Sequence, residues 1–141
     1  MATIDAQDAI IGRLGARVAK LLLSGEKVEI INPEKALMKG SLEAAKEKYL
    51  SRRGQQNKRT PEESPHWPRA PHLLLRRMMR GMLPYWSKRG REAYKRLHVL
   101  AVAPAGAKAQ KIPEAKAESK HGTFTLGELC VELGYHRRQA S

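Results

Sequence analysis

Residues 3–31 read TIDAQDAIIGRLGARVAKLLLSGEKVEII, and this stretch decides the fold. Its first three residues are typical of a short strand, and residues 28–31 form a second β-rich run. Between the two, apolar side chains recur at helical spacing over residues 9–24, with Asp8 as the predicted N-cap and Gly25 as the residue that ends the helix. A strand, a helix and a strand within about 30 residues indicate a βαβ unit with parallel strands. The chain is therefore predicted to be an α/β protein.

Local patterns predict the remaining elements of what we expect to be a single domain over residues 1–141. Thr125 and Glu128 form a capping box at the start of the last helix. Residues 53–71 contain four prolines and are expected to form an extended basic loop, while residues 103–121 are expected to form an irregular C-terminal segment. We expect helices over residues 41–52, 72–83, 88–97 and 125–134, and a strand over residues 97–102.

The positive charge of the chain is concentrated in its middle third. The whole sequence has a net charge of +13, and residues 46–96 hold 15 basic and 4 acidic side chains. Residues 1–45 hold 6 of each kind, so they are neutral, and residues 97–141 hold 6 basic and 4 acidic side chains. A neutral fold with one basic block is typical of a nucleic-acid-binding protein.

Two other interpretations of the basic block are a solvated charged surface and a membrane-binding surface. A solvated surface usually interleaves both signs of charge, whereas this block is nearly free of acids, and Arg, which suits bidentate phosphate contacts, outnumbers Lys by ten to five. Three aromatic residues, Trp67, Tyr85 and Trp86, lie among the cations and suit stacking on bases. A membrane surface protein needs an apolar anchor, but the apolar side of residues 72–83 is required for the core. No DNA-recognition pattern is present, so folded RNA is the favoured partner.

The same sequence disfavours catalytic, metal and nucleotide sites. The glycines at 12 and 15 fit neither a dinucleotide-binding nor a P-loop pattern and are predicted to serve helix packing. The single cysteine, Cys130, allows no intrachain disulfide or zinc-type pair and is predicted to be an inert core thiol. We therefore expect a soluble intracellular protein without metal, cofactor or small-molecule substrate. The candidate acid–base residues are scattered: Asp5, Asp8, Glu29, Glu34, His72 and His98.

Short motifs along most of the chain resemble the large-subunit ribosomal protein thirteen family in its archaeal form. The most specific is Arg80-Gly81-Met82-Leu83-Pro84. The others are Ile4-Asp5-Ala6, Gly12-Arg13-Leu14, Leu22-Leu23-Ser24-Gly25, Val28 to Asn32 with Glu34, Gly40, Arg69-Ala70-Pro71, Lys88-Arg89-Gly90 and Leu97-His98-Val99, with a looser match at Leu126 to Leu129 and at Leu133 to Tyr135.

This resemblance implies a three-layer α/β/α fold around a small, mostly parallel, four-stranded sheet. It also implies a structural role without catalysis. The protein would bind 23S-type rRNA beside neighbouring large-subunit proteins in the cytoplasmic ribosome and support assembly of the subunit. A free-standing RNA chaperone or regulator, not confined to the ribosome, is the alternative that the composition leaves open.

The RNA-binding residues are predicted to lie on the loop, on the helix over residues 72–83 and just after Pro84. Gly81 and Gly90 are expected to let RNA or another backbone approach closely. Tyr85 and Trp86 are expected either to stack on RNA or to belong to the core. The predicted phosphate contacts are Arg52, Arg53, Lys58, Arg59, Arg69, Arg76, Arg77, Arg80, Lys88, Arg89 and Arg91.

Overall fold

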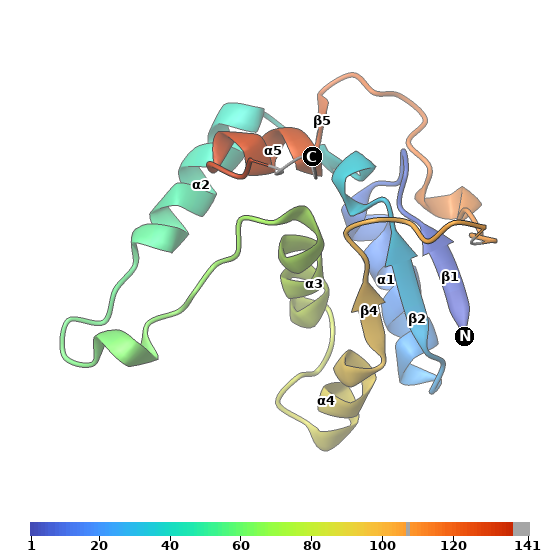
Figure 1. The fold of residues 1–141 in the computed structure, drawn as a ribbon, viewed down its shortest axis with the longest axis horizontal. Helices are drawn as coiled ribbons and strands as arrows, with labels where there is room; N and C mark the ends of the chain where they lie inside the picture. Colours follow the sequence, from blue (N-terminus) through green and yellow to red (C-terminus); the bar gives the residue numbers. More distant parts are fainter. Residues whose placement is uncertain (107, 137–141) are drawn as a thin grey trace.

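The βαβ unit is present in the computed structural model, which describes residues 1–106 and 108–136 (Figure 1). Strand β1 (Ala2–Asp5), helix α1 (Ile11–Leu23) and strand β2 (Val28–Ile31) follow one another, and the two strands pair in parallel. Residue 107, in the predicted C-terminal segment, and residues 137–141, in the predicted domain, lie outside the described residues.

The two ends of α1 are determined differently from each other. The helix begins after Ile10, so the prediction that Asp8 is its N-cap is wrong. An N-cap residue has an extended backbone, whereas Asp8 is left-handed, with a φ of 57°. Its N–H donates to the carbonyl of Lys35 at 3.2 Å, so a contact with a distant segment overrides the local signal. Gly25, with a φ of 102°, ends the helix as predicted.

The main sheet has three parallel strands in the order β1-β2-β4, because β4 (Leu97–Val99) pairs with β2. The expected four-stranded sheet is not confirmed. At the outer edge of β1 the described residues form one isolated bridge, where Gln110 donates its N–H to the carbonyl of Thr3 at 2.9 Å. Pro113 then opens a 3-10 turn, and this turn ends the pairing. The predicted strand over residues 97–102 stops at Val99.

A second, two-stranded sheet pairs β3 (Leu37–Lys39) with β5 (Thr123–Thr125) in antiparallel fashion, and neither strand is predicted by the sequence. The N–H of Leu37 donates to the carbonyl of Ala9 at 2.8 Å, which connects this sheet to the βαβ unit. The C-terminal part of the chain is thereby attached to the N-terminal part.

The predicted helices form with small changes in their bounds: α2 (Leu42–Gly54), α3 (Pro71–Gly81), α4 (Lys88–Lys95) and α5 (Leu126–Glu132). The capping box at Thr125 and Glu128 is confirmed. Three-residue 3-10 turns begin at Pro33 and Pro61. No helix in the described part of the chain has both the length and the apolar composition of a membrane span. The largest fully buried side chains are Leu14, Leu22, Ile30, Leu74, Leu75, Met79, Leu97, Leu126, Leu129, Val18 and Val28.

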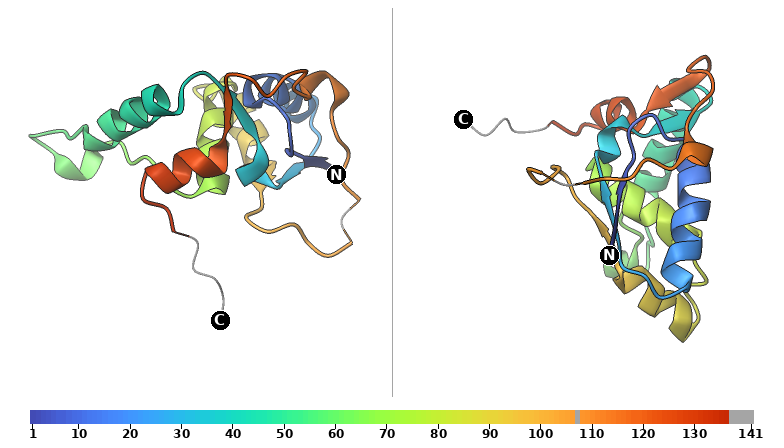
Figure 2. Two further views of the ribbon diagram at one scale, coloured as in Figure 1. Left: turned by 90° about the horizontal axis from the view of Figure 1, so that it is seen from above. Right: turned by 90° about the vertical axis from the view of Figure 1, so that its right-hand side faces the viewer.

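Helices α1 and α4 lie on the same side of the parallel sheet (Figure 2). The strand register places Thr3, Glu29 and His98 in one row across the sheet, and all three remain partly or fully exposed. The structure is therefore an α/β protein with a small, mostly parallel sheet, while the expected three-layer arrangement is not confirmed. Helix α2 and residues 55–70, together called the arm, project away from this body (Figure 1).

Candidate nucleic-acid interface

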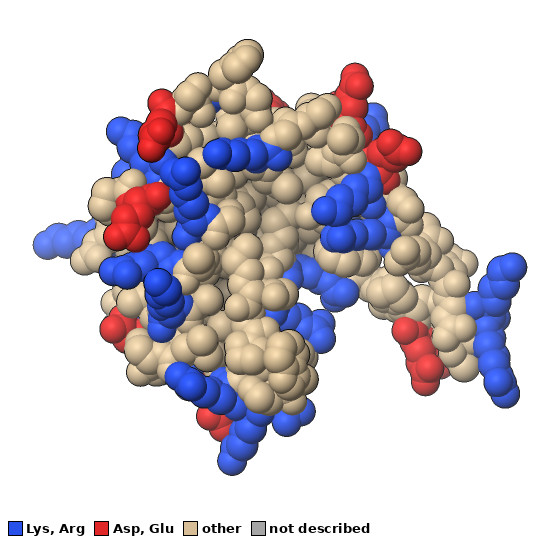
Figure 3. Space-filling model, turned by 180° about the vertical axis from the view of Figure 1, so that it is seen from behind, with Lys and Arg blue, Asp and Glu red and all other residues tan. Residues whose placement is uncertain are grey.

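The predicted RNA-binding residues lie on the arm, on α3 and on α4. Lys and Arg side chains spread over the face opposite to that of Figure 1 and border the hollow between the body and the arm (Figure 3). The ion pairs of the described residues join Lys46 to Glu132, Lys111 to Asp5 and Lys120 to Asp8. None of these three lysines belongs to the predicted set, so the ion pairs leave the charge of the predicted set available to an anion.

Helix α3 carries the arginine row, defined as Arg76, Arg77 and Arg80. Pro71 occupies the first turn, where a missing N–H costs nothing, and Leu75 and Met79 are buried against the core. The same 3.6-residue periodicity places the arginines on the other side of the helix, where each is half-buried.

Each guanidinium of the arginine row lies over an aromatic ring that another segment supplies. Arg76 lies 4.8 Å from the ring centre of Tyr94 in α4, and Arg77 lies 4.5 Å from that of Trp67 in the arm. Arg80 lies 3.9 Å from the ring centre of Tyr85. Stacking occupies the flat face of the guanidinium, and its exposed N–H groups, which lie in its plane, can donate to phosphate oxygens, whereas the Nε of Arg76 is buried without a hydrogen-bond partner in the described part of the chain. The row is thus preorganised for binding an anion.

Trp67 connects the arm to α3. The guanidiniums of Arg77 on α3 and Arg52 on α2 both lie over its ring, that of Arg52 at 4.8 Å from the ring centre. The ring of Tyr49 meets it edge-on, with the two ring centres 5.9 Å apart. Arg53 donates to the backbone carbonyl of Trp67. These contacts hold the returning half of the loop beside α3, so Arg77 on α3 comes close to Arg52 and Arg53 on α2 although α2 and α3 are separated by the loop.

Repulsion between cations accompanies this gathering. Burial and, second, the nearby charge of Arg69 lower the pKa of Arg53. Like charges held close together raise the free energy of the free protein, and a bound phosphate relieves this repulsion.

The tip of the arm and the start of α4 supply the remaining cations. Lys58 and Arg59 are exposed at the tip, where the amide of Asn57 donates to the hydroxyl of Thr60 at 2.8 Å and shapes the turn. Lys88, Arg89 and Arg91 occupy the first half of α4, where the helix dipole disfavours cations and favours anions. The first turn of α4 contains no acidic residue, and this arrangement suits a phosphate.

The two predicted close-approach glycines have different surroundings. A Cβ at Gly90 would overlap with the carbonyl carbon and oxygen of Pro84, so the neighbour that approaches closely is the chain's own backbone. A Cβ at Gly81 would meet no atom within 4 Å. Of the two, Gly81 is the glycine that leaves open space for another molecule.

Open space beside α3 forms a concave site that we call the aromatic recess. It has a volume of about 490 Å³. Trp86 is 85% exposed, whereas Tyr85 is half-buried with its ring edge-on to Tyr94 at 5.5 Å. Of the two residues predicted to stack or to join the core, Trp86 is outside the core. The recess is lined by Trp67, Arg77, Arg80, Gly81, Leu83, Tyr85 and Trp86.

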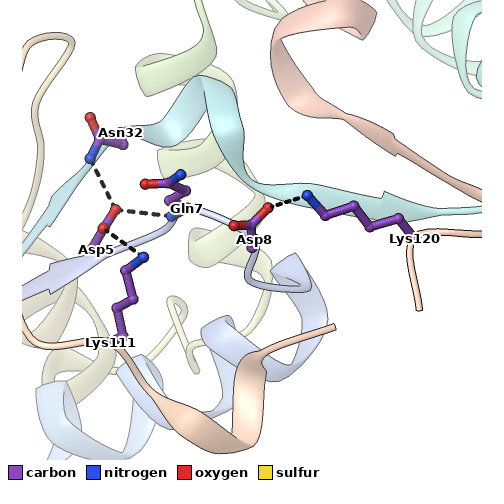
Figure 4. Close-up of polar contacts among 6 residues, drawn as sticks. All are labelled: Asp5, Gln7, Asp8, Asn32, Lys111 and Lys120. Carbon is purple, nitrogen blue, oxygen red and sulfur yellow. Dashed lines mark hydrogen bonds and ion pairs between the residues drawn. The ribbon is translucent and has the colours of Figure 1, made fainter. Parts of the chain in front are cut away.

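The aspartates nearest the C-terminal segment have structural contacts. Asp5 accepts hydrogen bonds from the backbone N–H of Gln7 and the amide of Asn32, both at 3.0 Å, and lies 3.8 Å from Lys111 (Figure 4). Asp8 pairs with Lys120 at 3.0 Å. These contacts attach residues 108–120 to the end of β1 and the turn that follows it. Among the described residues, no cluster of three His, Cys, Asp or Glu side chains could hold a metal ion.

Two other reactive side chains are placed in the core or near it. Burial raises the pKa of the Cys130 thiol to about 12, as expected of an inert core thiol. Burial lowers the pKa of His72, whose Nδ1 is buried without a hydrogen-bond partner in the described part of the chain. Sequence patterns did not identify Tyr49 and Tyr94 as supports of the arginines, because those contacts join separate helices.

Comparison with known proteins supports one family. The family model described as ribosomal protein L13 matches residues 1–105. The chain is 43% identical to the large ribosomal subunit protein uL13 of Methanopyrus kandleri, in an alignment that covers 94% of this chain and 86% of that protein. It is 38% identical to the proteins of the same name from Methanococcus maripaludis, covering 95% of this chain and 98% of the relative, and from Archaeoglobus fulgidus, covering 94% and 86%.

Proposed function

Because the chain belongs to the ribosomal protein L13 family, we propose that it is a structural, non-catalytic component of the large ribosomal subunit in the cytoplasm. Its partners are 23S-type rRNA and neighbouring proteins of the subunit. The proposal extends to this chain the role that is stated in the names of its archaeal relatives. The described residues beyond the family match, 106 and 108–136, belong to the same domain in this proposal because β5 pairs with β3.

The observation that carries the RNA-binding part is the arginine row, Arg76, Arg77 and Arg80. Three guanidiniums lie on one helix, each over a ring from another segment. An isolated fold gains little from gathering like charges at one place, whereas a phosphate backbone neutralises them and releases its counterions. The row therefore supplies the central phosphate contacts of the interface.

Cations on both sides of the row extend the contact along RNA. The arm contributes Arg52, Arg53 and Arg69 near Trp67, with Lys58 and Arg59 at the tip, and the first half of α4 contributes Lys88, Arg89 and Arg91. These side chains lie on three separate elements, and this spread suits irregular folded RNA, which is recognised by shape and phosphate position more than by base sequence. Binding supports assembly of the subunit by holding RNA segments in place.

Sedimentation through a high-salt sucrose gradient tests the ribosomal role. We expect the tagged protein from its native cells to migrate with the large subunit at one copy per particle. Release into the light fractions, with RNA binding intact at low salt, would instead indicate a free-standing RNA chaperone or regulator.

A charge-reversal pair tests the interface itself. Changing Arg76, Arg77 and Arg80 to Glu is expected to abolish RNA binding. The matched control changes Arg13, Arg17 and Lys20, three exposed cations on α1, to Glu, which alters the net charge by the same amount. Equal loss in both variants would mean that binding follows net charge alone and that the arginine row has no special role.

A further inference from the structure

The aromatic recess is a concave site in the described part of the chain to which the proposed phosphate contacts give no specific ligand. It lies where α3, the α3–α4 connection and the arm meet, and its volume of about 490 Å³ lies within the range of small-ligand sites, about 300–1,000 Å³. Its walls combine three aromatic rings with Arg77 and Arg80, and no carboxylate lines it.

We propose that the aromatic recess receives a single unstacked nucleotide of the bound RNA, with the base against Trp86 and the adjoining phosphate against Arg77 and Arg80. This inference rests on the proposed RNA-binding function and adds to it a site for a base. Phosphate contacts alone do not require an indole ring, so the recess is a distinct feature of the surface.

Exposure of Trp86 is the first argument. Trp86 is 85% exposed, the highest exposed fraction among the large apolar residues that the structure describes. Covering a large aromatic ring with a flat partner removes apolar surface from water and is therefore favourable. Every nucleic-acid base has a flat face that can stack in this way, whatever its identity.

The fixed arginines are the second argument. The guanidiniums of Arg77 and Arg80 lie against Trp67 and Tyr85, at 4.5 and 3.9 Å from the ring centres. An apolar peptide segment in the recess would bury both cations without a counter-charge, which is unfavourable. A nucleotide suits both kinds of lining residue, because its flat base can stack on the aromatic rings and its phosphate can pair with the two arginines.

Gly81 is the third argument. It lies at the wall of the recess, and a Cβ there would meet no atom within 4 Å. Its backbone has no positive φ, so packing and conformation allow other residues at this position. The absent side chain keeps the recess open, and this provides a variant that closes the site without removing any charge.

The test uses the full chain and three hairpin RNAs of the same stem. One contains a bulged 2-aminopurine nucleotide, one contains an abasic bulge, and one has no bulge. We expect the protein to bind the 2-aminopurine bulge about tenfold more tightly than the abasic bulge, as one base–aromatic stack suggests, and to quench its fluorescence.

Two variants locate the effect. Trp86→Ala removes the stacking ring, and Gly81→Gln fills the recess while keeping every cation. Both are expected to lose the tenfold preference and the quenching, because a base can no longer stack in the recess, while every cation of the interface is kept. Val131→Ala, which truncates an exposed apolar residue on α5, is the control and should behave as wild type.

Four results would overturn the inference. A wild-type protein that binds both bulges equally, or a preference that survives in both variants, would show that no base enters the recess, while the proposed RNA binding would stand. Self-association that Trp86→Ala abolishes would assign the recess to a second copy of the chain. Failure to bind any of the three RNAs would refute the proposed RNA binding together with the inference.

Discussion

Gly90→Ala and Gly81→Ala are expected to change stability in opposite directions, although both glycines lie in helices of the basic region. At Gly90, the added Cβ would overlap with the carbonyl of Pro84 and approach the backbone nitrogen of Tyr85 to 3.0 Å. Backbone atoms cannot rotate away as a side chain can. The first turn of α4 must therefore shift, and the shift endangers the hydrogen bond from the Gly90 N–H to the hydroxyl of Ser87 at 3.1 Å.

The size of each effect follows from two terms. Overpacking costs about 1–3 kcal/mol, and we take roughly 3 kcal/mol because the obstacle at Gly90 is backbone. Replacing Gly by Ala in a helix stabilises it by about 1 kcal/mol. Gly90→Ala is thus expected to lower the free energy of unfolding by about 2 kcal/mol. Gly81→Ala meets no overlap, and at the last residue of α3 it should raise that free energy by about 0.5 kcal/mol.

Urea unfolding followed by circular dichroism measures both variants against the wild type. In thermal unfolding, Gly90→Ala should lower Tm by roughly 7 °C. A Gly90→Ala protein as stable as the wild type would show that α4 tolerates the shift at no cost and would refute the packing argument. A Gly81→Ala protein destabilised as much as Gly90→Ala would refute the distinction between the two glycines.

Other predictions concern the arm, the core thiol and a half-buried histidine. Lys58→Ala and Arg59→Ala should each reduce the slope of log affinity against log salt by about 0.7–0.9 without changing stability; an unchanged slope would make that residue a bystander. Cys130, whose thiol has a pKa of about 12, should resist iodoacetamide at about pH 8 until the protein unfolds, and fast labelling of the native protein would contradict its burial. Because burial lowers the pKa of His72, the unfolded state binds its proton more readily than the folded state, so stability should fall as the pH drops below 6.5, the ordinary pKa of histidine. His72→Gln should flatten that dependence in urea unfolding, and an equal pH dependence in the variant would rule out His72 as its source.

Elements with strong local signals could be predicted from the sequence. The apolar spacing of α1 and α3, the proline at the start of α3 and the capping box of α5 all act within a few residues, so a linear pattern contains them. The strands β3 and β5 could not be predicted in the same way. Each has three residues, and each forms only because the other lies beside it.

The candidate site divides in a similar way. The sequence alone shows that residues 46–96 carry most of the net charge and that arginine dominates there. It does not show which aromatic rings support the arginines, because Arg77 and Trp67, or Arg76 and Tyr94, belong to different elements. The recess beside Trp86 likewise needs the arm, α3 and the α3–α4 connection in place.

By itself, then, the sequence determined the βαβ unit, the amphipathic helices and the position of the basic block, because periodicity, capping and charge are properties of neighbouring residues. Only the tertiary structure decided which rings the arginines stack on and that Trp86 remains exposed. It also decided that a side chain at Gly90 would overlap with the backbone, whereas a Cβ at Gly81 would meet no other atom within 4 Å. Stacking, overlap and exposure depend on distances between residues of different helices and loops, and folding alone sets those distances.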